Sequence, residues 1–260
     1  MSPSWRESLD VLIGPAEVRV RRLSRGWQPR EIASAASPIV PCTRAGIAEA
    51  LATACAAVQG APADARVVIS SEWIRLGLIR DAKALRGSAE QQAAAAHTLR
   101  RIYGDSAADW RVAFARQGRD TLIAVGIEAA LFGAIASALE GAQCRLVSLA
   151  PLFADSLNRC RSEIRGPAWF VAAESTRVVL GYSDGAGLRN LRSHRINGEL
   201  EHELPAWIEQ GRVLDGIEPD ASEVIVALSL RAPLDAQRLP FAVRQIALDA
   251  PSLSSPQAST

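Results

Sequence analysis

The order of strand-like and helix-like segments repeats within this chain. Between Leu9 and Ser70, three short strand-like segments precede a segment with helical spacing and then a largely apolar run. The same order returns after the pair Gly166-Pro167. Alternation predicts strands and i, i+3, i+4 spacing predicts helices, so the chain is expected to contain two units of three strands, a helix and a strand. This repetition predicts two lobes of similar architecture.

The first unit carries clear start and stop signals. Gly14-Pro15 separates its first two predicted strands, and Thr43 is placed to cap the N-terminus of its helix. The last strand is apolar on both faces, as expected inside a sheet. We assign residues 1–71 to a first lobe, with strands at Leu9–Ile13, Glu17–Ser24 and Glu31–Ala36, a helix from Thr43 to Ala57, and a strand at Ala65–Ser70.

The middle of the chain predicts a small α+β subdomain inserted at residues 72–150. Its most apolar stretch, Thr121–Ala142, contains Glu128 at its centre and is interpreted as a strand followed by a buried core helix rather than a membrane span. A helix at 151–165 is expected to return to the first lobe. The other predicted elements are a strand at Trp73–Arg80, a helix from a capping Ser88 to Tyr103, a hairpin with its turn at Gln117–Asp120, and a strand from Cys144.

Gly166-Pro167 marks the start of the second lobe, because this pair ends a helix and restarts the chain in extended form. The lobe is assigned to residues 166–250. Its predicted elements are the strands WFVAA, TRVVLGY, GLRNLRSHRI and EVIVALSL, with a helix at about Gly198–Gln210. The remaining residues, 251–260, are polar and are expected to form a disordered tail.

Composition excludes several classes of function. The net charge is +1, and Lys83 is the only lysine, so neither a nucleic-acid footprint nor a polybasic membrane patch is indicated. The four cysteines are dispersed and are expected to be reduced. The N-terminal residues lack the apolar run of a signal peptide, which predicts a cytoplasmic protein.

The segment GYSDG, Gly181–Gly185, matches the G-x-S-x-G nucleophile elbow. That motif requires a strand-to-helix turn, whereas an alternating segment follows here, and Asp-Gly is itself a hairpin signal. We therefore predict a hairpin turn. His97, His194 and His202 have no second ligand at a zinc spacing, so no metal site is predicted.

One long segment resembles a known family. VVISSEWIRLGLIRDAKALRGSAEQQAAAAHTLRRIYGDSAADWRVAF, residues 67–114, is similar to the cytoplasmic domain of type II secretion system protein L and to PilM-like proteins of type IV pilus assembly. The similarity extends through IAVGIEAALFGAIASAL and WFVAAESTRVVLGY and spans about Leu9 to Leu230. It implies an α/β fold of the actin-like ATPase type, with two ribonuclease H-like lobes and a small α+β subdomain inserted in the first.

The resemblance also identifies the loops that would hold a nucleotide. Nucleotide-binding members carry an aspartate in the first hairpin, where this chain has apolar Leu12, which cannot ligate magnesium. The second lobe has Ala173 and Glu174 where a D-x-G hairpin is expected, and LSLRAPL, residues 228–234, replaces an adenosine-binding Gly-Gly turn. We therefore expect no nucleotide, no other cofactor, no metal and no catalytic residues.

The resulting hypothesis is a non-catalytic cytoplasmic scaffold of a type IV pilus or type II secretion assembly platform, peripheral to the inner membrane. The resemblance implies two partners, the N-terminal peptide of a PilN-like inner-membrane protein and the assembly ATPase, and a homodimer is possible. Trp73, Arg75 and Trp110 are the candidate peptide-contacting residues, with packing in the core as the competing interpretation.

Three alternatives stay open at this point. A nucleotide-binding PilM-like ATPase would need Asp10, Glu17 or Glu174 to replace the missing metal ligands. A serine hydrolase would use Ser183 with His194 or His202 and an acid such as Asp184. A cell-division adaptor of the FtsA type would need a C-terminal amphipathic helix, which PSLSSPQAST does not provide.

Overall fold

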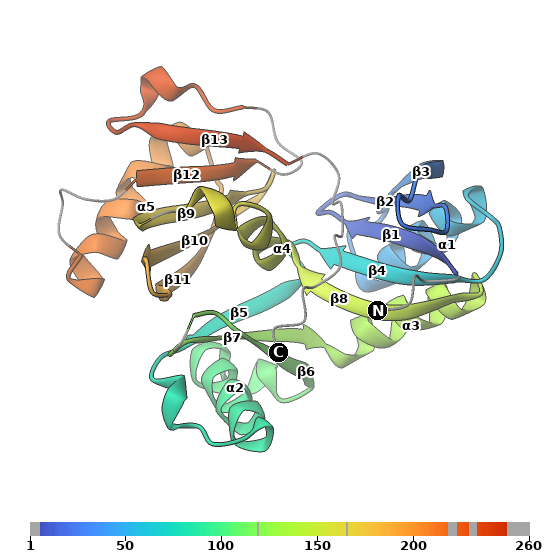
Figure 1. Cartoon of the computed structure of the whole chain (residues 1–260), viewed down its shortest axis with the longest axis horizontal. Helices are drawn as coiled ribbons and strands as arrows, with labels where there is room; N and C mark the ends of the chain where they lie inside the picture. Colours follow the sequence, from blue (N-terminus) through green and yellow to red (C-terminus); the bar gives the residue numbers. More distant parts are fainter. Residues whose placement is uncertain (1–5, 119, 165, 218–222, 229–232, 249–260) are drawn as a thin grey trace. The chain divides into compact units, whose positions relative to one another are not determined.

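The first lobe is built on a mixed five-stranded sheet (Figure 1). This computed structural model describes residues 6–118, 120–164, 166–217, 223–228 and 233–248. The strand order is β3-β2-β1-β4-β8, with β2 antiparallel to both neighbours and β4 parallel to both of its own. The strands are β1 (Glu7–Ile13), β2 (Glu17–Leu23), β3 (Glu31–Pro38), β4 (Ala63–Ile69) and β8 (Cys144–Pro151).

The second lobe repeats this sheet. Its order is β11-β10-β9-β12-β13, and its neighbours run in the same relative directions as their counterparts. The predicted duplication is therefore confirmed at the level of topology. The strands are β9 (Pro167–Ala173), β10 (Arg177–Asp184), β11 (Leu188–Arg195), β12 (Glu223–Leu228) and β13 (Val243–Ala247), the last of which the sequence pattern did not predict.

One helix follows the third strand in each lobe. In the first lobe Thr43 caps this helix as predicted, because its side chain accepts a hydrogen bond from the Gly46 backbone N–H. In the second lobe Gly216, at a φ of 63°, ends the helix in the left-handed conformation that favours glycine. The helices of the lobes are α1 (Arg44–Ala57), α3 (Ala129–Gly141), α4 (Leu152–Arg159) and α5 (Leu200–Asp215), with short 3₁₀ turns at Arg161–Glu163 and Ala236–Arg238.

The inserted subdomain is a three-stranded antiparallel sheet in the order β5-β7-β6, against which α2 packs. Helix α2 spans the predicted residues, but Gly87 rather than Ser88 occupies its N-cap position, and no side chain caps it. The elements are β5 (Ile74–Ile79), α2 (Ser88–Tyr103), β6 (Trp110–Arg116) and β7 (Leu122–Glu128), with 3₁₀ turns at Ala82–Ala84 and Gly104–Ala107.

Two predicted boundaries are wrong. Strand β8 pairs with β4 in the first sheet, so the insertion does not extend to residue 150. The helix expected to return to the first lobe packs instead on β9, where Phe153 of α4 meets Phe170 with ring centroids 5.7 Å apart. Both errors have one cause, because β8 and α4 are placed by contacts with strands that are distant in sequence or that follow later in the chain.

The chain separates into two compact units. One contains the described residues up to Ser70 together with Ala130–Pro151, and the other contains Ser71–Ala129 and Leu152–Leu248. The inserted sheet therefore forms one unit with the second lobe, although it interrupts the first lobe in sequence. In the described part of the chain, no helix combines the length and apolar character needed to cross a membrane.

Gly211 allows α5 to approach β9 closely. A Cβ atom at this position would lie 2.5 Å from Cη2 of the buried Trp169. We expect Gly211→Ala to lower the free energy of unfolding by about 1–3 kcal/mol, since helix and indole would have to separate. Gly133 of α3 provides the matched control because its added Cβ would meet no atom within 4 Å.

Gly133→Ala is expected to raise the free energy of unfolding by about 0.5–1 kcal/mol, through higher helix propensity alone. Urea denaturation of the two variants and the parent measures both changes. Equal stabilisation by the two substitutions would contradict the close approach of α5 to Trp169.

Candidate functional site

The first hairpin of the fold has apolar residues where a metal-binding hairpin needs acid. Leu12 and Ile13 are buried at the end of β1, and the Gly14 N–H donates to the Glu17 carbonyl at 2.9 Å across the turn. The Glu17 carboxylate pairs with Arg19 on the same strand. Asp10 lies earlier in β1, buried, with its carboxylate 3.5 Å from the Arg21 guanidinium. Two of the three proposed substitutes for a metal ligand, Asp10 and Glu17, are therefore engaged in ion pairs within the sheet.

The corresponding hairpin of the second lobe, between β9 and β10, holds Glu174. This residue is fully buried, and its Oε1 accepts a hydrogen bond from the Ser71 backbone N–H at 3.0 Å. Its own N–H donates to the Arg177 carbonyl at 2.8 Å. Glu174 thus serves as a structural acceptor that fixes the entry to β5.

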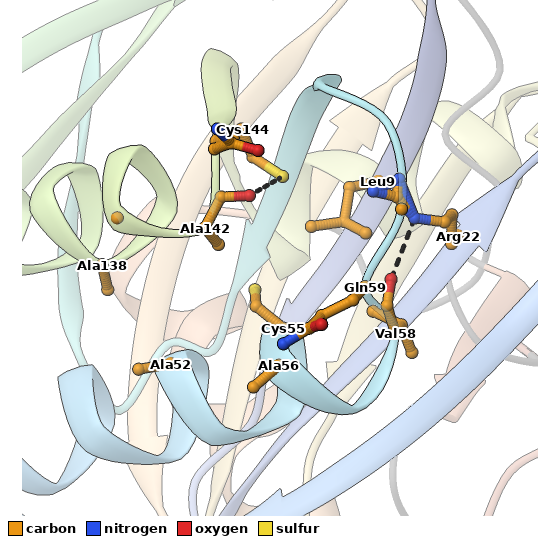
Figure 2. A pocket seen from close by; sticks show the side chains of 13 residues that line it. Leu9, Arg22, Ala52, Cys55, Ala56, Val58, Gln59, Ala138, Ala142 and Cys144 are labelled. Atoms are coloured by element: carbon orange, nitrogen blue, oxygen red, sulfur yellow. Dashed lines mark hydrogen bonds between the residues drawn. The ribbon is translucent and has the colours of Figure 1, made fainter.

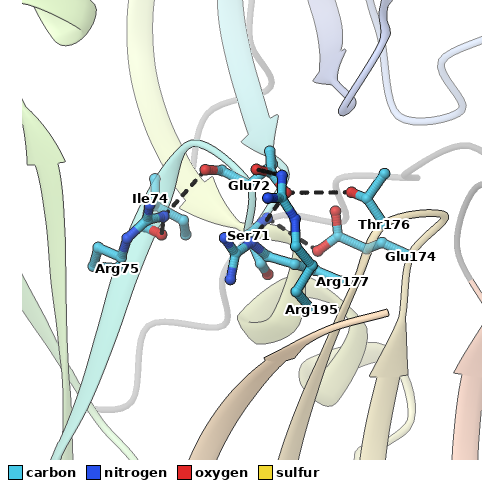
Figure 3. A network of polar contacts seen from close by, with 8 residues as sticks. All are labelled: Ser71, Glu72, Ile74, Arg75, Glu174, Thr176, Arg177 and Arg195. Carbon is cyan, nitrogen blue, oxygen red and sulfur yellow. Dashed lines mark hydrogen bonds and ion pairs between the residues drawn. The ribbon is translucent and has the colours of Figure 1, made fainter. Parts of the chain in front are cut away.

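Next to it lies an ionic network around Glu72 (Figure 3). One carboxylate oxygen of Glu72 accepts from Arg177 Nε at 3.0 Å, and the other accepts from Arg195 Nη2 at 3.3 Å. Thr176 adds a hydroxyl donor at 3.3 Å. The network joins the start of the inserted subdomain to β10 and β11. Sequence reasoning missed it because its members lie more than a hundred residues apart.

Of the predicted partner-binding residues, Trp73 and Arg75 lie beside this network, both half-buried. Arg75 donates to the carbonyls of Glu72 and Ile74 at 3.1 and 2.8 Å. It lines a cavity of about 90 Å³ together with Tyr103. Burial raises the pKa of Tyr103, and the nearby Arg75 opposes this shift.

Trp110 lies on β6 of the inserted subdomain and is also half-buried. Its ring centroid is 5.3 Å from that of Tyr103, and its edge covers Gly126, where a Cβ would come within 2.5 Å. The indole belongs to the apolar cluster of the subdomain. Tyr103 thus contacts Trp110 on one side and shares a cavity with Arg75 on the other. Whether any of the three residues contacts a partner stays a prediction.

Two further contacts hold the inserted subdomain to the second lobe. Asp215, the last residue of α5, accepts from Arg80 at 2.9 Å and from Arg192 at 2.7 Å, while Asn190 donates to it at 3.0 Å. Burial alone would raise the pKa of Asp215, but these three hydrogen bonds together lower it below the ordinary range. The hairpin of the subdomain also touches the β10–β11 turn, where Gly118 bridges to Gly187.

The GYSDG motif ends strand β10 and begins the β10–β11 turn at Gly185, so the hairpin is as predicted. Asp184 accepts hydrogen bonds from the N–H groups of Ala186 and Gly187 at 2.9 and 3.0 Å, and strand β11 follows. A nucleophile elbow needs a helix at this point. His194 stacks on Trp207, with ring centroids 4.7 Å apart, and His202 contacts Arg238. The serine-hydrolase alternative is therefore wrong in its central requirement.

A cavity of about 570 Å³ lies in the first lobe, between the C-terminal ends of α1 and α3 (Figure 2). Small side chains, Cys55 and Cys144 line much of it. Burial, together with the charge of Cys144, raises the pKa of Cys55 to about 12, and burial also raises the pKa of Cys144. Neither thiol is therefore activated as a nucleophile at neutral pH.

The described residues contain no group of three or more His, Cys, Asp or Glu side chains arranged to hold a metal ion. The prediction about the adenosine-binding turn at 228–234 falls largely on residues 229–232, which lie outside the described residues. The expected absence of cofactor and metal thus stays a prediction.

Two lobes with the same sheet order, one of them interrupted in sequence by a small α+β subdomain, define a protein of the actin-like fold. This class of fold is the one that the sequence predicts. No protein-family model matches the chain, and no curated protein matches it.

Solved structures confirm the fold. A Bacteroides thetaiotaomicron protein with an actin-like ATPase fold is 8% identical, with a TM-score of 0.65, and the match covers 94% of this chain and 91% of that one. A chain of the PilM-PilN type IV pilus biogenesis complex is 14% identical, with a TM-score of 0.66 and coverages of 92% and 88%. The cytoplasmic domain of EpsL, an inner-membrane component of the Vibrio cholerae type II secretion system, is 13% identical, with a TM-score of 0.52 and coverages of 93% and 90%. At these identities the likeness establishes the fold alone.

Proposed function

We propose that the chain is a non-catalytic scaffold of an inner-membrane assembly platform, in type IV pilus formation or type II secretion. The likeness in fold to a chain of the PilM-PilN complex and to the EpsL cytoplasmic domain supports the assignment to this kind of machine. The proposal that the scaffold is non-catalytic rests on the residues in the two hairpins where nucleotide-binding members of the fold would hold a metal and phosphates. Leu12 is buried and apolar in the first, and Glu174 in the second is engaged by the Ser71 N–H.

The proposal includes the partners. A PilN-like membrane protein would present a short cytoplasmic peptide to the scaffold, and the assembly ATPase would bind elsewhere on it, so that the chain is held at the inner membrane through its partners. Trp73 and Arg75 are the predicted peptide contacts that retain exposed surface without belonging to the apolar cluster around Trp110. A homodimer belongs to the same proposal.

Nucleotide binding is the first property to measure. Isothermal titration with ATP and magnesium, followed by thermal unfolding in the same buffer, is expected to give neither heat nor a shift in Tm. A bound nucleotide at a hundred times its Kd would stabilise the protein by roughly 2.7 kcal/mol, which either method detects. Tight binding would replace the proposal with a nucleotide-binding PilM-like ATPase.

The positive test uses synthetic N-terminal peptides of PilN-like proteins, with scrambled peptides as controls. We expect the immobilised native peptide to retain the protein and the scrambled peptide to release it. Arg75→Ala is expected to weaken retention, while Arg100→Ala, at an exposed residue that does not line the cavity beside Arg75, should leave it unchanged. Equal retention by native and scrambled peptides would contradict the assigned machine.

A further inference from the structure

A groove of about 560 Å³ runs along the inserted subdomain and the second lobe, within one compact unit. We call it the basic groove and define it by Leu78 of β5, Arg80 just after that strand, Arg101 and Ile102 of α2, and Leu191 and Arg192 of β11. Its volume falls within the range of about 300–1,000 Å³ that ligand sites occupy. It does not include Trp73, Arg75 or Trp110.

The charges in the basic groove are unbalanced. Arg80 and Arg192 share a single carboxylate, that of Asp215. Within the described part of the chain, Arg101 makes neither an ion pair nor a hydrogen bond through its side chain, and this side chain is exposed. Three guanidinium groups thus face one carboxylate in a chain whose net charge is only +1. The local excess of positive charge is complementary to an acidic ligand.

The groove also offers apolar surface. Ile102 is 50% exposed although it lies in the last turn of α2, and Leu78 and Leu191 are half-buried beside it. A groove lined by both apolar side chains and arginines can bind a peptide in which a leucine-sized side chain is flanked by carboxylates. A polyphosphate fits less well, because α2 brings its C-terminal turn to the groove rather than the free N–H groups of a helix N-terminus. Three arginines are also far fewer than a nucleic-acid footprint needs.

We propose that the basic groove binds a short acidic peptide segment of a protein partner. An apolar side chain of the peptide packs against Ile102, and the carboxylates of the peptide pair with Arg101, Arg80 and Arg192. This site goes beyond the proposed function, because it does not depend on which machine the chain serves. It also lies apart from the predicted contacts Trp73 and Arg75.

Fluorescence anisotropy with a labelled peptide Gly-Glu-Leu-Asp-Leu-Glu-Gly tests the site. The second probe has Gln and Asn in place of the acidic residues. We expect the acidic probe to bind, the neutral probe to bind at least about tenfold more weakly, and added salt to weaken the acidic probe alone. Inorganic triphosphate should displace the acidic probe no better than sodium chloride at the same ionic strength.

Matched variants locate the binding. Arg101→Glu is expected to weaken the acidic probe by at least about tenfold, and Ile102→Ser to weaken it as well. Arg100→Glu makes the same change of charge on the adjacent exposed residue of α2, which does not line the groove, and should leave affinity unchanged. Thermal unfolding of each variant verifies that the fold is retained.

Several results would overturn the proposal. The proposal is wrong if the acidic probe does not bind. It is also wrong if Arg100→Glu and Arg101→Glu weaken the affinity for the acidic probe equally, because that result indicates non-specific attraction to the positively charged surface. Specific displacement by triphosphate would instead identify a phosphate site.

Discussion

Trp169→Ala is expected to lower the free energy of unfolding by about 3–5 kcal/mol, one of the two largest effects that the structure predicts for a single substitution. Trp169 on β9 is 1% exposed, and its ring lies 5.3 Å from that of Tyr182 and directly against Gly211 of α5. Removing the indole leaves a cavity between the sheet and the helix. The close packing at Gly211 limits how far that cavity can collapse.

Urea denaturation followed by circular dichroism measures the change. Trp27→Ala is the matched control, because Trp27 is 84% exposed, and its removal should change stability by no more than about 0.5 kcal/mol. If the two alanine variants lost similar stability, the packing described for the second lobe would be incorrect.

Arg22→Ala is expected to have an effect of similar size, about 3–5 kcal/mol. The Arg22 side chain is only 4% exposed. Its guanidinium donates to the Val58 and Ala61 carbonyls, which belong to the loop after α1, and to the Glu7 carboxylate, all within 2.9 Å. Its loss would leave these acceptors without their donor and would open the floor of the first-lobe cavity in Figure 2.

Arg19→Ala, on the same strand, removes an exposed pair with Glu17 and should cost at most about 1 kcal/mol. Arg22→Lys keeps the charge but lacks the planar fork that reaches two carbonyls and a carboxylate at once, so an intermediate loss is expected. Equal losses in Arg22→Ala and Arg19→Ala would show that the buried guanidinium does not anchor the loop.

Local signals in the sequence predicted the elements that local physics determines. Thr43 could be recognised as a helix cap because its hydroxyl acts on an N–H only three residues away. The turn after Ser183 could be recognised because Asp-Gly and the alternating segment that follows both favour a hairpin. These features need no knowledge of the rest of the chain.

Features that depend on distant partners could not be predicted. The membership of β8 in the first sheet and the packing of α4 on β9 are set by contacts across long sequence separations. The same holds for the candidate sites, because Glu72 finds Arg177 and Arg195, and Asp215 finds Arg80, only in the folded chain. A single arginine in the sequence carries no signal that distinguishes a buried anchor such as Arg22 from an exposed one such as Arg100.

The late position of β8 also governs the order in which the chain can fold during synthesis. Strand β4 has β1 on one side from the beginning, but its other neighbour is made only after the whole inserted subdomain. Until β8 is made, the backbone N–H and C=O groups on one side of the apolar strand Ala63–Ile69 are unpaired, and such an edge strand can pair with strands of other chains. The first lobe, although it leaves the ribosome first, therefore completes its sheet only after the inserted subdomain has emerged.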